Sequence, residues 1–161
     1  MIKYLIGIIV LVQIANAHLC IYDPPQRGNA LPFPMGPGYN DCYRPYPNCG
    51  NMTAGKPVVT FTSGQPYAVV FQQNYNHWYE PNQGYMDIAI SYNGDNGPFK
   101  QLSQTIDDFN AWDMVTQTNF TINVNIPSQP CSSCVLRVRY ISNNAGEPAP
   151  DFYQCADIAI E

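Results

Sequence analysis

Apolar and polar residues alternate along residues 85–92, which is the pattern of a half-buried β-strand. Met86, Ile88 and Ile90 would share one face of this strand, and Asp87 would lie on the opposite face. Two Asn-Gly pairs follow directly, and such pairs are signals for tight turns. The segment therefore predicts a strand that ends in a turn.

The same alternation occurs twice more, at residues 120–126 and 135–141. In the second of these segments, Arg137 and Arg139 are expected to face outward. A high content of β-branched and aromatic residues predicts three further strands, at 58–62, 67–72 and 153–160.

No segment shows a convincing helical period, and good helix formers are scarce. Residues 22–57 are rich in proline and glycine and are expected to form a long loop. A loop of this length in a compact domain is usually functional or pinned. Many short strands separated by turn signals predict an all-β protein built as a β-sandwich.

Residues 1–17 have the features of a secretory signal peptide. Lys3 is followed by an apolar run from 5 to 14, and Ala15-Asn16-Ala17 is a suitable cleavage site. The apolar run is about half the length that a membrane span requires. We therefore expect a secreted, extracellular protein with one mature domain, residues 18–161; an uncleaved N-terminal anchor is the alternative.

The expected mature domain contains all six cysteines of the chain. An even number in an exported chain predicts three disulfides that pin the long loops, with the connectivity left open. The Cys131-x-x-Cys134 spacing also occurs in zinc and redox sites, but zinc requires two more ligands and no second such pair is present. The predicted disulfide cysteines are Cys20, Cys42, Cys49, Cys131, Cys134 and Cys155.

Charged residues are sparse, and twelve of them are acidic against seven basic ones, of which one is Lys3. The absence of a basic stripe argues against nucleic acid as a partner. No polybasic segment or lipidation signal predicts a membrane partner. Asn51 and Asn119 begin Asn-x-Thr sequences and are predicted glycosylation sites, and a monomer is expected.

The mature domain has only two histidines, His18 and His77, and cleavage after Ala17 would make His18 its first residue. A free α-amine and the Nδ1 atom of the same residue can close a chelate ring on a metal ion. The imidazole of His77 would complete three nitrogen ligands, a histidine brace, and tetragonal nitrogen ligation favours copper. Each histidine taken alone is better explained as an ordinary residue, and the pair together with its sequence context favours the brace.

The sequence resembles the lytic polysaccharide monooxygenases and their relatives in the chitin-binding type-4 superfamily of histidine-brace copper proteins. The resemblance depends on His18 directly after the signal peptide, on Asn76-His77 before the strand that starts at Gly84, and on Phe-Tyr-Gln-Cys-Ala-Asp-Ile at 152–158. It implies an immunoglobulin-like or fibronectin III-like β-sandwich that binds one copper ion through His18 and His77.

The resemblance also implies an aromatic residue at the axial position of the copper. Counting three residues back from Cys155 gives Phe152, and a slip of one residue would select Tyr153 instead. Bacterial members often carry Phe at this position, whereas fungal cellulose-active members carry Tyr. Phe152 is therefore the preferred candidate, together with His18 and His77 as catalytic residues.

The chain departs from the fungal pattern because Pro150 occupies the position of a glutamine that lies two residues before the axial group. Other polar residues near the copper are candidates for helping to position oxygen species, namely Gln154, Glu80 and Gln72. Tyr75, Trp78 and Tyr79, with the tyrosines at 39–46, are candidates for a surface that stacks on sugar rings.

The implied activity is oxidative cleavage of chitin or a related β-linked polysaccharide, with an external reductant as a second partner. Two other functions remain open. A copper-acquisition protein would bind copper without cleaving polysaccharide and often carries Asp near the metal, for which Asp107, Asp108, Asp113 and Asp151 are candidates. A polysaccharide-binding module would retain its ligand after the metal is removed.

Overall fold

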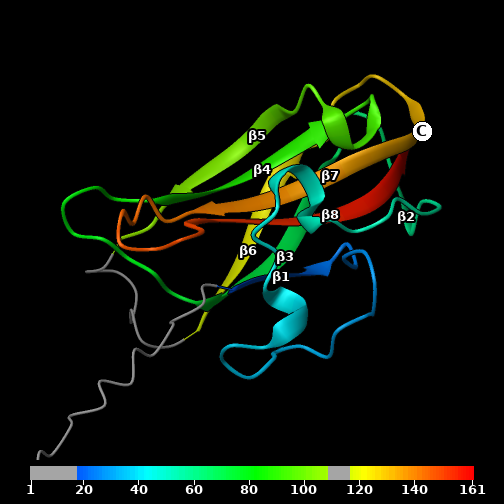
Figure 1. Cartoon of the computed structure of the whole chain (residues 1–161). Helices are drawn as coiled ribbons and strands as arrows, with labels where there is room; N and C mark the ends of the chain where they lie inside the picture. The colour runs from blue at the N-terminus through cyan, green and yellow to red at the C-terminus, as the bar shows by residue number, and fades with distance from the viewer. Residues whose placement is uncertain (1–17, 109–116) are drawn as a thin grey trace, which may run out of the picture.

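A computed structural model describes residues 18–108 and 117–161. The predicted signal peptide lies outside the described residues. Eight strands form two sheets that pack face to face (Figure 1). The strands are β1 (His18–Asp23), β2 (Val59–Phe61), β3 (Pro66–Tyr75), β4 (Tyr85–Ser91), β5 (Lys100–Ile106), β6 (Thr118–Asn125), β7 (Cys131–Ile141) and β8 (Asp151–Ile160).

One sheet has three strands in the order β1-β3-β6, and the other has five in the order β2-β8-β7-β4-β5. All pairs are antiparallel except β2 with β8, which is parallel. The apolar side chains on the inner faces form one core between the sheets. The predicted all-β sandwich is therefore confirmed.

Each of the six predicted strands is present, although β3, β7 and β8 are longer than expected. The sequence analysis missed β1 and β5. β5 is an edge strand, and most of its side chains are polar and at least partly exposed, so it lacks the expected apolar face. β1 is short and begins at the predicted cleavage site, where no turn signal marks its start.

Arg137 and Arg139 both lie on the outer face of β7, as expected, but Arg137 is not exposed to solvent there. Arg137 is 7% exposed and its guanidinium lies 3.9 Å from the centre of the Phe99 ring. Arg139 is partly exposed and pairs with Asp87, which is itself buried. The outer face of the five-stranded sheet is therefore covered over much of its area. The alternating sequence pattern predicts on which face of a strand a side chain lies, but not whether that face is exposed to solvent.

The long segment between β1 and β2 covers the edge of β8. The Arg27 N–H donates to the Cys155 carbonyl at 2.7 Å, and the Tyr153 N–H donates to the Arg44 carbonyl at 2.9 Å. The segment contains two short helical turns, η1 (Asn40–Cys42) and α1 (Pro47–Gly50). Backbone groups that an edge strand would leave unpaired are satisfied in this way.

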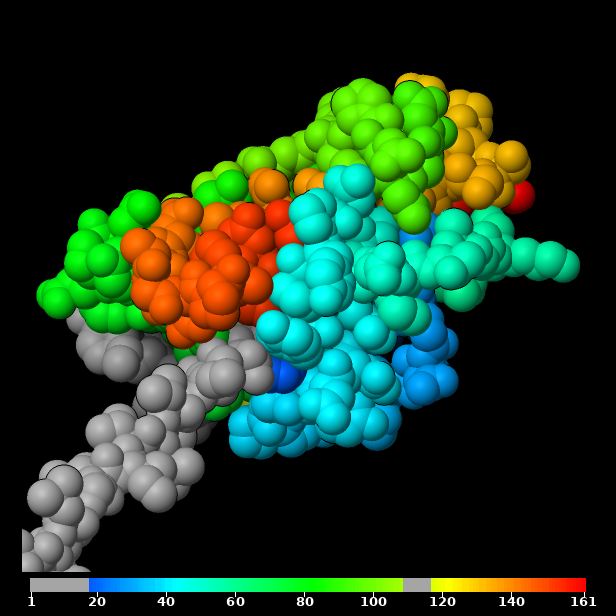
Figure 2. Space-filling view, viewed as in Figure 1, coloured from blue at the N-terminus to red at the C-terminus, as the bar shows by residue number. Residues whose placement is uncertain are grey.

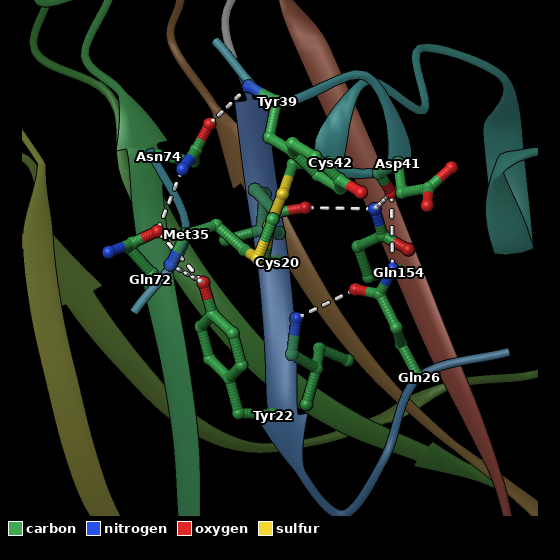
Figure 3. The surroundings of a disulfide bond; sticks show 12 residues. Cys20, Tyr22, Gln26, Met35, Tyr39, Asp41, Cys42, Gln72, Asn74 and Gln154 are labelled. Atoms are coloured by element: carbon green, nitrogen blue, oxygen red, sulfur yellow. Dashed lines mark hydrogen bonds between the residues drawn. A yellow bond between two sulfur atoms is a disulfide. The ribbon is translucent and has the colours of Figure 1, made fainter. Parts of the chain in front are cut away.

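Three disulfides join the six cysteines, as predicted: Cys20–Cys42, Cys49–Cys155 and Cys131–Cys134. The first two attach the β1–β2 segment to β1 and to β8. Figure 3 shows the first, with Gln26 and Gln154 side by side beneath η1. Both amides donate to the Asp41 carbonyl, at 3.1 and 3.0 Å.

No helix in the described part of the chain is long and apolar enough to cross a membrane.

Removal of the Cys49–Cys155 disulfide is expected to destabilise the protein far more than removal of Cys131–Cys134. The two bonds close loops with sequence separations of 106 and 3 residues. Loop-closure entropy then gives about 4.7 kcal/mol for the long loop and about 1.6 kcal/mol for the short one. Urea unfolding of the two paired Cys→Ala variants measures the difference, and equal losses would contradict this account.

Candidate metal centre

Three chain segments meet at one end of the sandwich, opposite the C-terminus (Figure 1). They are the start of β1, the connection between β3 and β4, and the connection between β7 and β8. His18 is the first residue of β1, His77 lies just after β3, and Phe152 is the second residue of β8. The fold therefore brings the predicted site residues to the same end of the molecule.

The pairing of β1 with β3 places the two histidines on neighbouring segments. His18 is opposite Tyr75, two residues before His77. The strand register shifts between His18 and Leu19, and an irregularity of this kind re-aims the side chain next to it. Both histidines are buried, with 5% of each exposed.

Two aromatic rings connect the histidines. The Tyr43 ring lies 5.4 Å from the His18 ring and 5.9 Å from the Phe152 ring. The Phe152 ring in turn lies 6.1 Å from the His77 ring, with the two planes nearly perpendicular. The imidazoles therefore share an apolar wall made by Tyr43 and Phe152.

Tyr43 was not singled out as a residue of the site itself by the sequence analysis. It follows Cys42 directly, and Cys42 is bonded to Cys20, two residues after His18. Only the pairing of these cysteines identifies Tyr43 as a neighbour of His18, and the sequence left that pairing open.

Phe152 and Tyr153 lie on opposite faces of β8. Phe152 is 1% exposed and packs in the core beside the histidines. The Tyr153 ring lies 5.9 Å from the Arg137 guanidinium on the outer face, and its hydroxyl donates to Asp151 at 3.2 Å. The geometry supports Phe152, and not Tyr153, as the aromatic group next to the histidines.

Glu147 is the acidic residue that approaches the histidine pair, and sequence analysis missed it. Its Oε1 atom is 3.4 Å from Nδ1 of His77. Burial raises the pKa of the Glu147 carboxyl above its ordinary value. Glu147 lies in the β7–β8 connection, and no motif marks this position in the sequence.

The three polar residues that were candidates for a place near the copper have other surroundings. Glu80 is exposed. Gln72 lies on the outer face of the three-stranded sheet, where it bonds to Tyr22 at 2.9 Å and Asn119 at 2.8 Å. Gln154 is buried on the inner side of β8, but its amide donates to the carbonyls of Leu19 and Asp41. It therefore anchors the residue after His18.

A buried polar network surrounds the backbone of His77. The His77 N–H donates to the Tyr140 hydroxyl at 3.0 Å, and that hydroxyl donates to Asp107 Oδ2 at 2.6 Å. Burial, the Asp107 charge and the Asp107 hydrogen bond all raise the pKa of Tyr140. The phenol therefore stays protonated and links His77 to the carboxylate.

The aromatic residues proposed for a sugar-binding surface differ in exposure. Tyr75, Trp78 and Tyr79 are half-buried around His77, and the Tyr75 ring is 5.6 Å from the His77 ring. Within the 39–46 segment, the side chains of Tyr39 and Tyr46 are 39% and 61% exposed. The predicted glycosylation sites Asn51 and Asn119 are both exposed.

The sequence profile of a family described as "lytic polysaccharide mono-oxygenase, cellulose-degrading" matches residues 20–158. The chain belongs to this family. No curated protein matches the chain significantly.

Two solved structures share part of the fold. A lytic polysaccharide monooxygenase of family AA15 from Thermobia domestica, solved in the Cu(I) state, is 16% identical with a TM-score of 0.43, covering 81% of this chain and 72% of that one. A superoxide reductase (neelaredoxin) from Ignicoccus hospitalis is 13% identical with a TM-score of 0.41, covering 68% of this chain and 77% of the other. Neither likeness is strong enough to inform the function of this chain.

Membership in this monooxygenase family implies copper, and the donor chemistry at the paired histidines fits that ion. Within the described residues, no group of three or more His, Cys, Asp and Glu side chains is arranged to hold a metal. The available donors are instead two buried imidazoles, and the predicted cleavage after Ala17 would add an α-amine on residue 18. An all-nitrogen set of this kind suits copper better than calcium or magnesium.

Replacement of Phe152 by Ala is expected to disturb both histidines, whereas Tyr153→Phe should leave them unchanged. Phe152→Ala opens a cavity between Tyr43 and His77 and should cost about 3–5 kcal/mol. Tyr153→Phe removes one partly exposed hydrogen bond on the outer face, worth about 1 kcal/mol. Urea unfolding and NMR signals of the two imidazoles measure these effects, and imidazole signals that moved only in Tyr153→Phe would reverse the assignment.

Proposed function

We propose that the chain is processed after Ala17 and acts as a secreted copper-dependent monooxygenase that cleaves chitin or a related β-linked polysaccharide. His18 would hold the copper through its α-amine and Nδ1 and His77 through its imidazole, with the Phe152 ring beside His77. The observation that carries this proposal is a pair of buried histidines in a member of this family. They lie at the start of β1 and just after β3, and the rings of Tyr43 and Phe152 connect them.

The copper would supply the redox chemistry that activates an oxygen co-substrate, with electrons from an external reductant. The chain's own residues have other tasks. The rings of Tyr43 and Phe152 keep water from the inner side of the histidine pair. The Glu147 carboxylate beside Nδ1 of His77 would favour a proton on that atom and leave Nε2 as the donor, as is usual for metal-binding histidines.

A polysaccharide would bind over the same end of the sandwich. In Figure 2 the green β3–β4 connection, the orange β7–β8 connection and the cyan segment near residue 40 form adjoining parts of one face. Trp78, Tyr75 and Tyr79 belong to the first of these regions, and Tyr39 is exposed in the third. Aromatic rings on such a face would stack against sugar rings.

Two of the four candidate aspartates, Asp107 and Asp151, have other partners, which favours an oxygenase over a copper-acquisition protein. Such a protein would need an Asp free to reach the metal, but Asp107 is bonded to Tyr140 and Asn76, and Asp151 accepts from Tyr153. Asp113 lies outside the described residues. Pro150, in place of a polar residue before Phe152, is the observation that keeps copper binding without catalysis as the second candidate.

The protein starting at His18 is expected to bind one equivalent of Cu(II) with an axial, nitrogen-rich electron paramagnetic resonance spectrum. One extra glycine before His18 turns its α-amine into an amide and removes one copper ligand. Loss of a hydrogen-bond partner of a metal ligand typically lowers metal affinity about 10–100-fold, and the loss of Cu(II) affinity here should be larger. Calorimetric titration of both forms, with His77→Ala as a third sample, measures this. Equal copper affinity in all three would exclude the proposed site.

With reductant and copper, the processed protein is expected to release oxidised oligosaccharides from chitin, detected by mass spectrometry, and His77→Ala should release none. Cellulose is the matched second substrate. One bound copper without oxidised products from either polymer would favour the copper-acquisition alternative. Binding to polysaccharide that persists in a chelator, without products, would favour a binding module.

A further inference from the structure

We infer that Tyr140 and Asp107 are positioning residues for His77, and that they fix its backbone before any metal binds. The inference rests on the proposed function of the histidine pair. Their hydrogen bonds reach the His77 N–H and the Asn76 side chain, so their action on the metal site would pass through residues 76–78.

Tyr140 connects His77 to the opposite sheet. It lies on β7 and is fully buried, and its hydroxyl accepts the His77 N–H at 3.0 Å. The same hydroxyl donates to Asp107 Oδ2 at 2.6 Å. Because the oxygen accepts one bond while its proton makes another, its direction is fixed at both ends.

Asp107 uses its second oxygen to hold the residue before His77. Oδ1 accepts from Asn76 Nδ2 at 2.9 Å and from Gln73 Nε2 at 3.2 Å. The other end of the Asn76 side chain accepts the Trp78 N–H at 2.5 Å. Hydrogen bonds therefore hold the side chain of Asn76 and the backbone N–H groups of both His77 and Trp78.

Asp107 is itself held on rigid backbone. It follows β5 directly, is fully buried, and its N–H donates to the Gly84 carbonyl at 3.0 Å. A Cβ atom on Gly84 would collide with the carbonyl of Ile141, so glycine is what allows this close approach to β7. The network therefore ties the segment that carries His77 to two strands of the five-stranded sheet.

A purely structural role would not require this arrangement. A buried carboxylate is costly unless it is fully hydrogen-bonded, and an apolar pair would fill the same space more cheaply. Within the described residues, Tyr140, Asn76 and Gln73 donate side-chain hydrogen bonds to Asp107. Two of these donors, Tyr140 and Asn76, also hold residues 76–78 directly. Fixing a metal ligand within narrow limits is the use that explains the cost.

Tyr140→Phe is the variant that tests the inference, with Tyr67→Phe as a matched control. Tyr67 also donates its hydroxyl to a carboxylate, Asp23 Oδ1 at 2.5 Å, but it lies near the other end of β3. Tyr140→Phe is expected to lower Cu(II) affinity about 10–100-fold and to change the copper hyperfine splitting. Tyr67→Phe should leave both unchanged. Thermal unfolding of the two variants checks that each is folded at the temperature of the copper titration.

A second measurement does not need copper. In the metal-free protein the His77 amide proton should exchange slowly with solvent, and Tyr140→Phe should accelerate its exchange at least about tenfold. If Tyr140→Phe does not fold, Asn76→Ala removes the same network from its loop side and should lower copper affinity in the same direction.

The outcomes separate the inference from the proposed function. Failure of the unmodified processed protein to bind copper would refute the proposed function. Tight binding that is the same in a folded Tyr140→Phe variant, with an unchanged spectrum, would refute the positioning role alone. Fast exchange of the His77 amide in the metal-free protein would also refute it.

Discussion

The antiparallel pairing of β1 with β3 is the constraint on which the site depends. It sets His18 opposite Tyr75 and so brings the start of β1 to the segment that carries His77. A slip of one residue in this pairing would turn the inward-facing Leu19 and Ile21 to the outer face, which their complete burial in the core forbids. The apolar core therefore fixes the position of His18, although His18 contributes little to that core.

Further contacts hold β1 in place from both sides. Cys20 is bonded to Cys42 on the outer side, and the Gln154 amide holds the Leu19 carbonyl on the inner side at 2.8 Å. The Ile21 N–H donates to Gln26 at 2.9 Å, so the chain just after β1 also supports it. A terminal strand is normally prone to fraying, and these bonds would keep His18 in a defined position after the predicted cleavage.

The long β1–β2 segment needs an anchor of its own, and Arg27 provides it. The Arg27 guanidinium is buried between Asp157 and Asp95, at 2.6 and 2.7 Å. The neighbouring carboxylates raise the pKa of Arg27 even though its burial, the largest single influence, acts in the opposite direction. The buried Arg27 cation is paired with both carboxylates only when the β1–β2 segment takes this path. The ion pairs therefore select one conformation of the segment.

Period-two alternation was sufficient to predict β4 and β6, because one face of each strand meets the core and carries apolar residues. It failed for β5, a polar edge strand. It placed Arg137 on the correct face of β7 but did not reveal that Arg137 is buried, because the loop that covers the outer face is distant in sequence. His18, His77 and Phe152 could be named because a family motif marks them. Tyr43, Glu147 and the Tyr140–Asp107 pair could not, since each reaches the histidines only through the cysteine pairing or through loops that fold back across the sheets.

The dense C-terminal motif has a physical explanation in the two faces of β8. Alternate residues face inward, where Phe152 lies beside His77, Gln154 holds β1, and Ala156 and Ile158 fill the core. The intervening residues face outward, where Cys155 bonds to Cys49 and Asp157 binds Arg27. A strand covered on both faces has no position where a side chain is free of contacts. A substitution that displaces the β8 backbone from one face would therefore also disturb the contacts on the other face. One strand therefore positions both Phe152 beside the proposed copper and the residues that hold the β1–β2 segment. The same register of β8 is required for both.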